Sequence, residues 1–117
     1  MVAPKNALVK AAKILVAEDS PTQAQRLQYL LEHEGHEVRV AGNGRIALEI
    51  IDGGWKPAIV LSDIVMPEVD GYELTRRIKA QPHLRDVPVV LVTTMSEPQD
   101  VILGLECGAD NFVLKPY

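Results

Sequence analysis

The stretch LSDIVMPEVDG, residues 61–71, carries an apolar run directly into a carboxylate and then into a turn. The run begins at residue 58 as AIVLSD and is apolar over most of its length, as expected for a strand that is buried on both faces of a sheet. Asp63 ends the run, and the MP and DG pairs that follow favour a sharp turn toward a helix. A carboxylate here would lie at the carboxyl end of a strand, where open α/β sheets bind their ligands.

On both sides of this stretch, short apolar runs alternate with segments of helical period, which is the pattern of a parallel sheet covered by helices. Ser20 and Pro21 suit the start of a helix, and Gly35 suits its end. Ser96 with Gln99 resembles a capping box. The predicted strands cover residues 13–19, 36–41, 58–63, 87–94 and 111–115. The sequence therefore predicts an α/β fold with a five-stranded parallel sheet.

Composition limits the classes of protein to consider. The chain has 117 residues and is 47% hydrophobic, which is enough to bury one core, so we expect one domain. A net charge of -4 without a dense Lys/Arg run argues against nucleic acid and anionic membranes as partners. No apolar stretch has the length of a membrane span. The single cysteine, Cys107, cannot form an internal disulfide, so we expect a cytoplasmic protein with an ordinary buried thiol near a helix end.

Polar side chains follow the predicted strands at their carboxyl ends. Glu18 and Asp19 end the first strand, and Asp63 ends the third. Thr93 and Thr94 end the fourth strand, and Lys115 ends the fifth. If the first strand is central, these ends converge in one crevice. Each residue alone could be a solvated strand end, but three clustered carboxylates repel one another unless a cation joins them, and hard oxygen ligands suit Mg²⁺.

A carboxylate beside Mg²⁺, with a lysine and a threonine directed at the same point, is arranged to attack a phosphoryl group. Asp63 would be the nucleophile. Mg²⁺ and Lys115 would offset the charge on the phosphoryl oxygens, and Thr93 would donate a hydrogen bond to one of them. The sequence therefore predicts phosphoryl transfer to Asp63.

Four motifs, VAEDS, LSDIVMPEVDGYEL, VPVVLVTT and GLECGADNFVLKPY, closely resemble the receiver domain of two-component response regulators over almost the whole chain. The resemblance implies a flavodoxin-like (βα)5 fold with strand order 2-1-3-4-5. It also implies that a sensor histidine kinase or a phosphotransfer protein donates the phosphoryl group from a phosphohistidine. The family's final helix is absent from this chain, so we expect an N-terminal extension over 1–12 and a receiver domain lacking its C-terminal helix over 13–117.

The resemblance also implies a set of metal ligands. Asp19 and Asp63 would bind Mg²⁺ directly, and the backbone carbonyl of Val65 would be a further ligand. Glu18 would assist through water.

The same resemblance implies a conformational switch. Thr93 and Phe112 match the family's switch positions, and Lys115 matches its lysine. Phosphorylation would draw Thr93 toward Asp63 and let the Phe112 ring rotate inward, which would shift the face of the fourth helix and fifth strand.

Without the final helix, one face of the sheet should be half bare. We expect an exposed strip along the first and third strands, at residues such as Leu15 or Ile59. Another chain, residues 1–12 or a rearranged first helix would cover it. A homodimer would form through this face or through the fourth helix and fifth strand.

Two other classes stay open. Mg²⁺-dependent aspartyl phosphatases resembling haloacid dehalogenases carry a second aspartate two residues after the nucleophile, where this chain has Val65. A pseudo-receiver is a pure interaction module that is expected to lose acids or the lysine, and none is lost here. We therefore expect a regulatory phosphoacceptor domain rather than an enzyme, one that assists its own phosphorylation and slow dephosphorylation.

Overall fold

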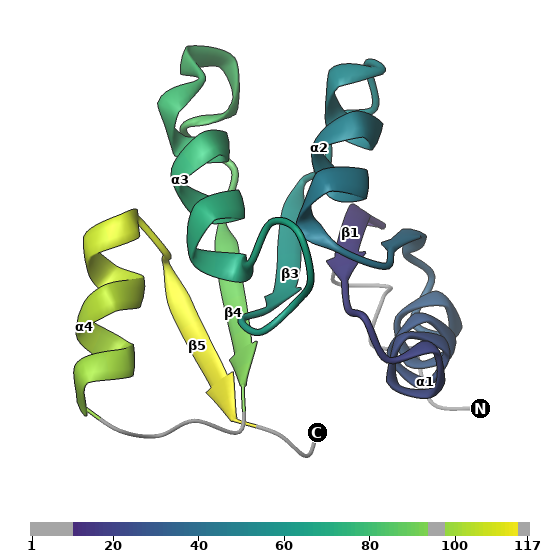
Figure 1. The fold of residues 1–117 in the computed structure, drawn as a ribbon. Helices are drawn as coiled ribbons and strands as arrows, with labels where there is room; N and C mark the ends of the chain where they lie inside the picture. The colour runs from purple at the N-terminus through teal and green to yellow at the C-terminus, as the bar shows by residue number, and fades with distance from the viewer. Residues whose placement is uncertain (1–10, 94–97, 115–117) are drawn as a thin grey trace.

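The computed structural model describes residues 11–93 and 98–114 (Figure 1). Five parallel strands form one sheet in this part of the chain. The strands are β1 (Lys13–Ala17), β2 (Glu37–Ala41), β3 (Ile59–Asp63), β4 (Val89–Thr93) and β5 (Asn111–Leu114). Their order is β2-β1-β3-β4-β5, which confirms the predicted flavodoxin-like topology. β4 begins two residues later than predicted because Pro88 has no N–H to donate, although its carbonyl still accepts a hydrogen bond from Val60 at 2.9 Å.

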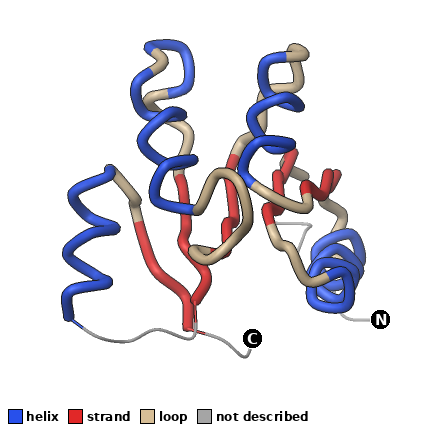
Figure 2. Tube along the Cα trace, viewed as in Figure 1, coloured by secondary structure: helices blue, strands red, loops and turns tan. Residues whose placement is uncertain are grey.

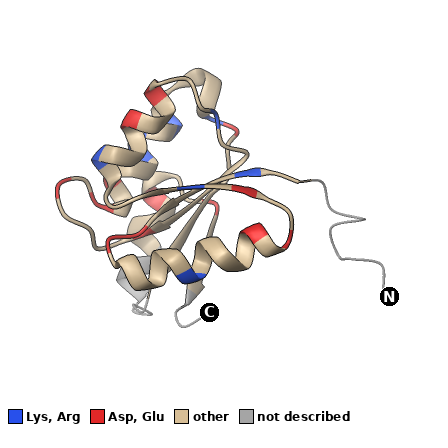
Figure 3. Cartoon of the chain, turned by 90° about the vertical axis from the view of Figure 1, so that its right-hand side faces the viewer, with Lys and Arg blue, Asp and Glu red and all other residues tan. Residues whose placement is uncertain are grey.

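Helices connect the strands (Figure 2). They are α1 (Pro21–His33), α2 (Gly44–Asp52), α3 (Gly71–Ala80), the 3-10 turn η2 (Pro82–Leu84) and α4 (Pro98–Cys107). Ser20 caps α1 as predicted, and Asn43 and Asp70 cap α2 and α3 by accepting hydrogen bonds from backbone N–H groups. Among the described helices, none is long and apolar enough to cross a bilayer. Acidic and basic positions are mixed along the helices in view in Figure 3.

The sheet has a different cover on each face. The larger core lies on the side of α2 and α3, and its wholly buried members include Leu15, Val60, Leu74, Ile78 and Leu91. On the other side, Leu27 and Leu31 of α1 pack against a smaller cluster formed by Ile14, Val16 and Val38. Alternate residues of β1 thus enter the two cores, as the pleat of a strand requires.

The expectation that Leu15 lies on an exposed strip is wrong. Its side chain is 0% exposed and belongs to the larger core, because the pleat of β1 directs its neighbours Ile14 and Val16 toward α1 instead. Ile59 is half-buried against the smaller cluster, as is Ala12. Residues 1–10 lie outside the described part of the chain, so the expected cover by 1–12 is described only at its last two residues.

Lys79 of α3 forms hydrogen bonds with the segment before β4 and with the residue before β5. Its Nζ donates hydrogen bonds to the carbonyls of Val87 and Arg85, at 2.7 and 3.2 Å, and to the Asp110 carboxylate at 2.8 Å. The same carboxylate accepts the Val89 N–H at 2.8 Å. Burial acts to raise the pKa of Asp110, but the hydrogen bonds from Lys79 and Val89, with the Lys79 charge, hold that pKa below its ordinary value.

Replacing Lys79 by methionine should lower the free energy of unfolding by about 1 to 3 kcal/mol, because two carbonyls and a carboxylate lose a charged donor. The depressed pKa of Asp110 means that its contribution is present above the unfolded-state pKa and is lost as pH falls through the folded-state pKa. The variant should therefore lose less stability than the wild type on acidification. The difference is small because 48% of the Asp110 side chain is exposed.

Urea unfolding at neutral and at acidic pH measures both effects. Lys56→Met is the matched control, since it removes the same charge from an exposed lysine in the loop between α2 and β3. An equal loss of stability in the two variants would contradict the role given to Lys79.

Candidate acidic site at the strand ends

Three carboxylates converge at the carboxyl edge of the sheet. Glu18 and Asp19 directly follow β1, and Asp63 is the last residue of the neighbouring β3, where Ala17 pairs with Ser62. One carboxylate oxygen from each of the three acids lies within 4.8 Å of the others. Parallel pairing of β1 with β3 therefore brings together acids that are 44 positions apart in the chain, 63 minus 19.

The three acids differ in their exposure to water. Glu18 is only 4% exposed, Asp63 is half-buried and Asp19 is exposed. The Glu18 carboxylate accepts the Ser20 N–H at 3.2 Å, and the Glu18 N–H donates to the Ala41 carbonyl of β2 at 3.0 Å. Two unit charges about 5 Å apart repel by about 1 kcal/mol in water and by about 3 kcal/mol at the effective dielectric of a protein surface. A cation placed among these oxygens would offset the repulsion.

The backbone around Asp63 is held from several sides. One Asp63 carboxylate oxygen accepts the Ile64 N–H at 2.9 Å, and the Asp63 carbonyl accepts the Ser62 hydroxyl at 2.8 Å. The chain then forms a loop that ends at Gly71, the first residue of α3. The Gly71 N–H donates to the Ile64 carbonyl at 2.8 Å, which closes the loop. A Cβ at Gly71 would lie 2.3 Å from the Asp63 carbonyl oxygen, so only glycine allows α3 to begin there.

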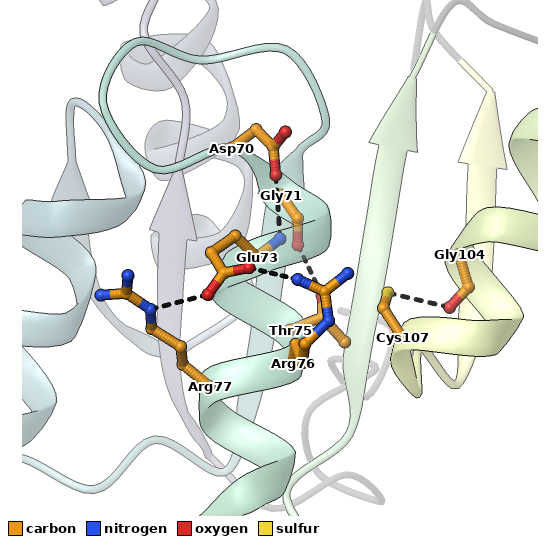
Figure 4. A network of polar contacts seen from close by, with 8 residues as sticks. All are labelled: Asp70, Gly71, Glu73, Thr75, Arg76, Arg77, Gly104 and Cys107. Carbon is orange, nitrogen blue, oxygen red and sulfur yellow. Dashed lines mark hydrogen bonds and ion pairs between the residues drawn. The ribbon is translucent and has the colours of Figure 1, made fainter.

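The first turn of α3 has its own network of polar contacts (Figure 4). Asp70 accepts the Glu73 N–H at 2.8 Å, and the buried Thr75 hydroxyl donates to the Gly71 carbonyl at 2.7 Å. Glu73 pairs with Arg77 at 2.9 Å, and this hydrogen bond is the main reason that the pKa of Glu73 is lowered. These contacts fix the helix start that contacts Asp63.

The other predicted site residues lie near this edge or outside the described part. Thr93 is 3% exposed and ends β4, next to Val92, the residue that pairs with Asp63. Val65 follows β3 in the loop, and its side chain is 61% exposed. Lys115 lies outside the described residues.

Phe112 is placed by a close approach to α4. It lies on β5 opposite Leu91 and is half-buried against the larger core. A Cβ at Gly104 would lie 2.0 Å from the tip of its ring. Sequence reasoning missed this contact, although a glycine inside a helix costs about 1 kcal/mol relative to alanine and so signals a close neighbour. Cys107, on the same helix, donates to the Gly104 carbonyl at 3.0 Å (Figure 4).

The thiol of Cys107 has the ordinary role predicted for it. It is 7% exposed at the end of α4, and burial raises its pKa, so it stays a neutral thiol.

Comparison with known proteins identifies the family. The response regulator receiver domain family matches residues 14–117. The chain belongs to this family. Receiver domains are regulatory domains of two-component systems, and the sheet order and the acidic cluster at the strand ends agree with that membership.

The chain is similar to proteins of several kinds. It is 37% identical over 105 residues to Protein PilH of Pseudomonas aeruginosa, covering 90% of this chain and 86% of that protein. It is 41% identical over 104 residues to a probable cyclic di-GMP phosphodiesterase of Vibrio cholerae, covering 88% of this chain but only 23% of that protein. The chain also matches the DNA-binding response regulator MtrA of Mycolicibacterium smegmatis, of which it covers 44%, less than half of the length.

Two solved structures share the fold. The signal receiver domain of a signal transduction histidine kinase from Syntrophus aciditrophicus is 48% identical with a TM-score of 0.84, covering 92% of this chain and 80% of that one. The receiver domain of the sensor histidine kinase PA1611 of Pseudomonas aeruginosa is 27% identical with a TM-score of 0.80, covering 92% and 87%. In that structure a magnesium ion is coordinated in the active site cleft.

Proposed function

We propose that this receiver domain accepts a phosphoryl group on Asp63 from the phosphohistidine of a sensor histidine kinase or of a phosphotransfer protein. The observation that carries the proposal is the cluster of three carboxylates within 4.8 Å at the edge of a receiver fold. Asp63 is the member of the cluster that belongs to a strand, and its carbonyl lies against the start of α3.

The residues at this edge fit Mg²⁺. Asp19 and Asp63 would bind it through their carboxylates, Val65 through its backbone carbonyl, and Glu18 through water. These donors are all oxygens and Asp19 is open to solvent, which suits an ion that keeps several water ligands. When bound, Mg²⁺ supplies positive charge that offsets the carboxylates and the incoming phosphoryl oxygens.

The transfer itself is a nucleophilic substitution at phosphorus. A carboxylate oxygen of Asp63 attacks, the bond between phosphorus and the donor's imidazole nitrogen breaks, and its electron pair stays on that nitrogen. The Thr93 hydroxyl donates a hydrogen bond to a phosphoryl oxygen, and Lys115 offsets the charge on another. The group leaves the protein again by slow hydrolysis.

Incubation with Mg²⁺ and acetyl phosphate, followed by intact mass measurement, should show one added phosphoryl group on the wild type. Asp63→Asn should show none, because an amide oxygen is a poor nucleophile. Chelation of Mg²⁺ should suppress the addition to the wild type. Asp86→Asn, at an exposed aspartate before β4, is the matched control and should gain the group normally. An equal gain of mass in Asp63→Asn would refute the assignment.

We also propose how the signal leaves the site. Phosphorylation draws Thr93 toward Asp63, and the Phe112 ring changes its position between β5 and α4. The close approach of Gly104 to this ring supports the proposal, because any movement of the ring changes its contact with α4. The face of α4 and β5 would then differ between the two states.

Phe112 is the one phenylalanine of the chain, so ¹³C-labelled phenylalanine gives one set of ring signals. In the wild type these signals should shift when acetyl phosphate is added. Gly104→Ala should shift them before phosphorylation, because a Cβ would occupy the place of the ring. Gly42→Ala should not, because a Cβ added at that glycine would meet nothing within 4 Å. Ring signals that do not respond to phosphorylation would remove the switch.

A further inference from the structure

The loop between β3 and α3, residues 64–70, is attached to the start of α2 through Glu68. One Glu68 carboxylate oxygen accepts hydrogen bonds from Asn43 at 3.0 Å and from Arg45 Nε at 2.9 Å. Glu68 has a φ of 67°, which lies in the left-handed region. Residues other than glycine and asparagine seldom adopt this backbone conformation. Such a backbone conformation persists where its surroundings hold it in place. The two donors from the start of α2 are such surroundings.

The backbones of the two segments also meet. The Gly44 N–H donates to the Val69 carbonyl at 3.1 Å. A Cβ at Gly44 would lie 2.4 Å from that carbonyl oxygen and 2.8 Å from a Val69 methyl group. Asn43 at the same time caps α2 by accepting the Ile46 N–H at 2.9 Å. The start of α2 and the second half of the loop are therefore one packed unit, and it depends on glycine at position 44.

Val65 lies in the first half of this loop, and its side chain is not anchored in either core. Its side chain is 61% exposed, whereas the next residue, Met66, is 7% exposed and anchored in the larger core. The position of the Val65 carbonyl thus depends on fixed points on either side of it. Asp63 is the point before it, and Met66 with the Glu68 attachment is the point after it.

We propose that Asn43, Gly44 and Arg45 are positioning residues that hold the loop so that the Val65 carbonyl faces the metal. The inference rests on the proposed function, since it assumes that Mg²⁺ binds at the acidic cluster. If these three residues had a purely structural role, replacing them would not change the affinity for Mg²⁺. The Arg45 and Glu68 side chains are 49% and 52% exposed, so their ion pair would add little to stability and nothing to Mg²⁺ affinity.

Two glycines of the same GNG sequence give a matched pair of variants. Gly44→Ala adds a Cβ against Val69, whereas Gly42→Ala adds one where nothing lies within 4 Å. We expect Gly44→Ala to weaken Mg²⁺ binding by about ten-fold, as for other changes to groups that orient metal ligands, and Gly42→Ala to leave it unchanged. Amide chemical shifts followed during a Mg²⁺ titration give the affinities, and thermal melts confirm that each variant is folded.

A second pair of variants tests the side-chain contacts. Glu68→Ala removes the attachment of the loop, and Glu49→Ala removes the other carboxylate that pairs with Arg45, which lies within α2. Loss of Glu68 should weaken Mg²⁺ binding by about two- to five-fold, the size expected for exposed charge pairs, and loss of Glu49 should not. Hydrogen exchange of the amides of residues 64–70 should become faster in Glu68→Ala and Gly44→Ala alone.

The outcomes separate this inference from the proposed function. Wild-type affinity and wild-type loop exchange in both Gly44→Ala and Glu68→Ala would overturn the positioning role while leaving the acidic site intact. A wild-type protein that binds no Mg²⁺ at the acidic cluster would overturn the proposed function and the inference with it. Equal losses in Glu49→Ala and Glu68→Ala would overturn the positioning role, because they would show a general effect of charge.

Discussion

Repulsion among the carboxylates of Glu18, Asp19 and Asp63 is the physical constraint that the strand ends of this sheet have to accommodate. The parallel pairing of β1 with β3 forces these groups to the same edge, within 4.8 Å of one another. Burial strengthens the repulsion, because Glu18 is only 4% exposed. Hydrophobic burial beneath the strand ends opposes this repulsion, and a cation that joined the three groups would offset it.

Two glycines let the loops approach this edge closely enough to hold it. Gly71 begins α3 directly against the carbonyl of Asp63, and Gly44 begins α2 against the carbonyl of Val69. In both places a Cβ would lie less than 2.5 Å from a carbonyl oxygen, so no other residue fits without a movement of the loop. The loop after β3 is thus held at its end, where α3 begins, and along its second half, where it contacts the start of α2. A rigid frame around an exposed segment is a common way to place a functional backbone group.

The sequence predicted the features that depend on local patterns. The strands and their order follow from apolar runs and the resemblance to receiver domains, and Ser20 was found as a cap because its chemistry is local. Leu15 was placed on the wrong face, because alternation along a strand separates two faces without showing which helices cover each one. The contacts of Gly44 and Gly104 were missed because they join segments that are distant in the chain. For Gly104, the sequence does contain a sign of the contact, because a glycine within a predicted helix indicates a close neighbour.

The most direct test of the account is the stability of the wild type and of Asp19→Asn, measured by urea unfolding with and without Mg²⁺. Without Mg²⁺, the variant should be more stable by about 1 kcal/mol, because one of three mutually repelling charges is gone. Mg²⁺ should stabilise the wild type by an amount that grows with its concentration, and should stabilise the variant less. Asp86→Asn controls for the loss of one exposed negative charge. If Asp19→Asn were no more stable than the wild type without Mg²⁺, and Mg²⁺ stabilised neither, the acidic cluster would not be a cation site.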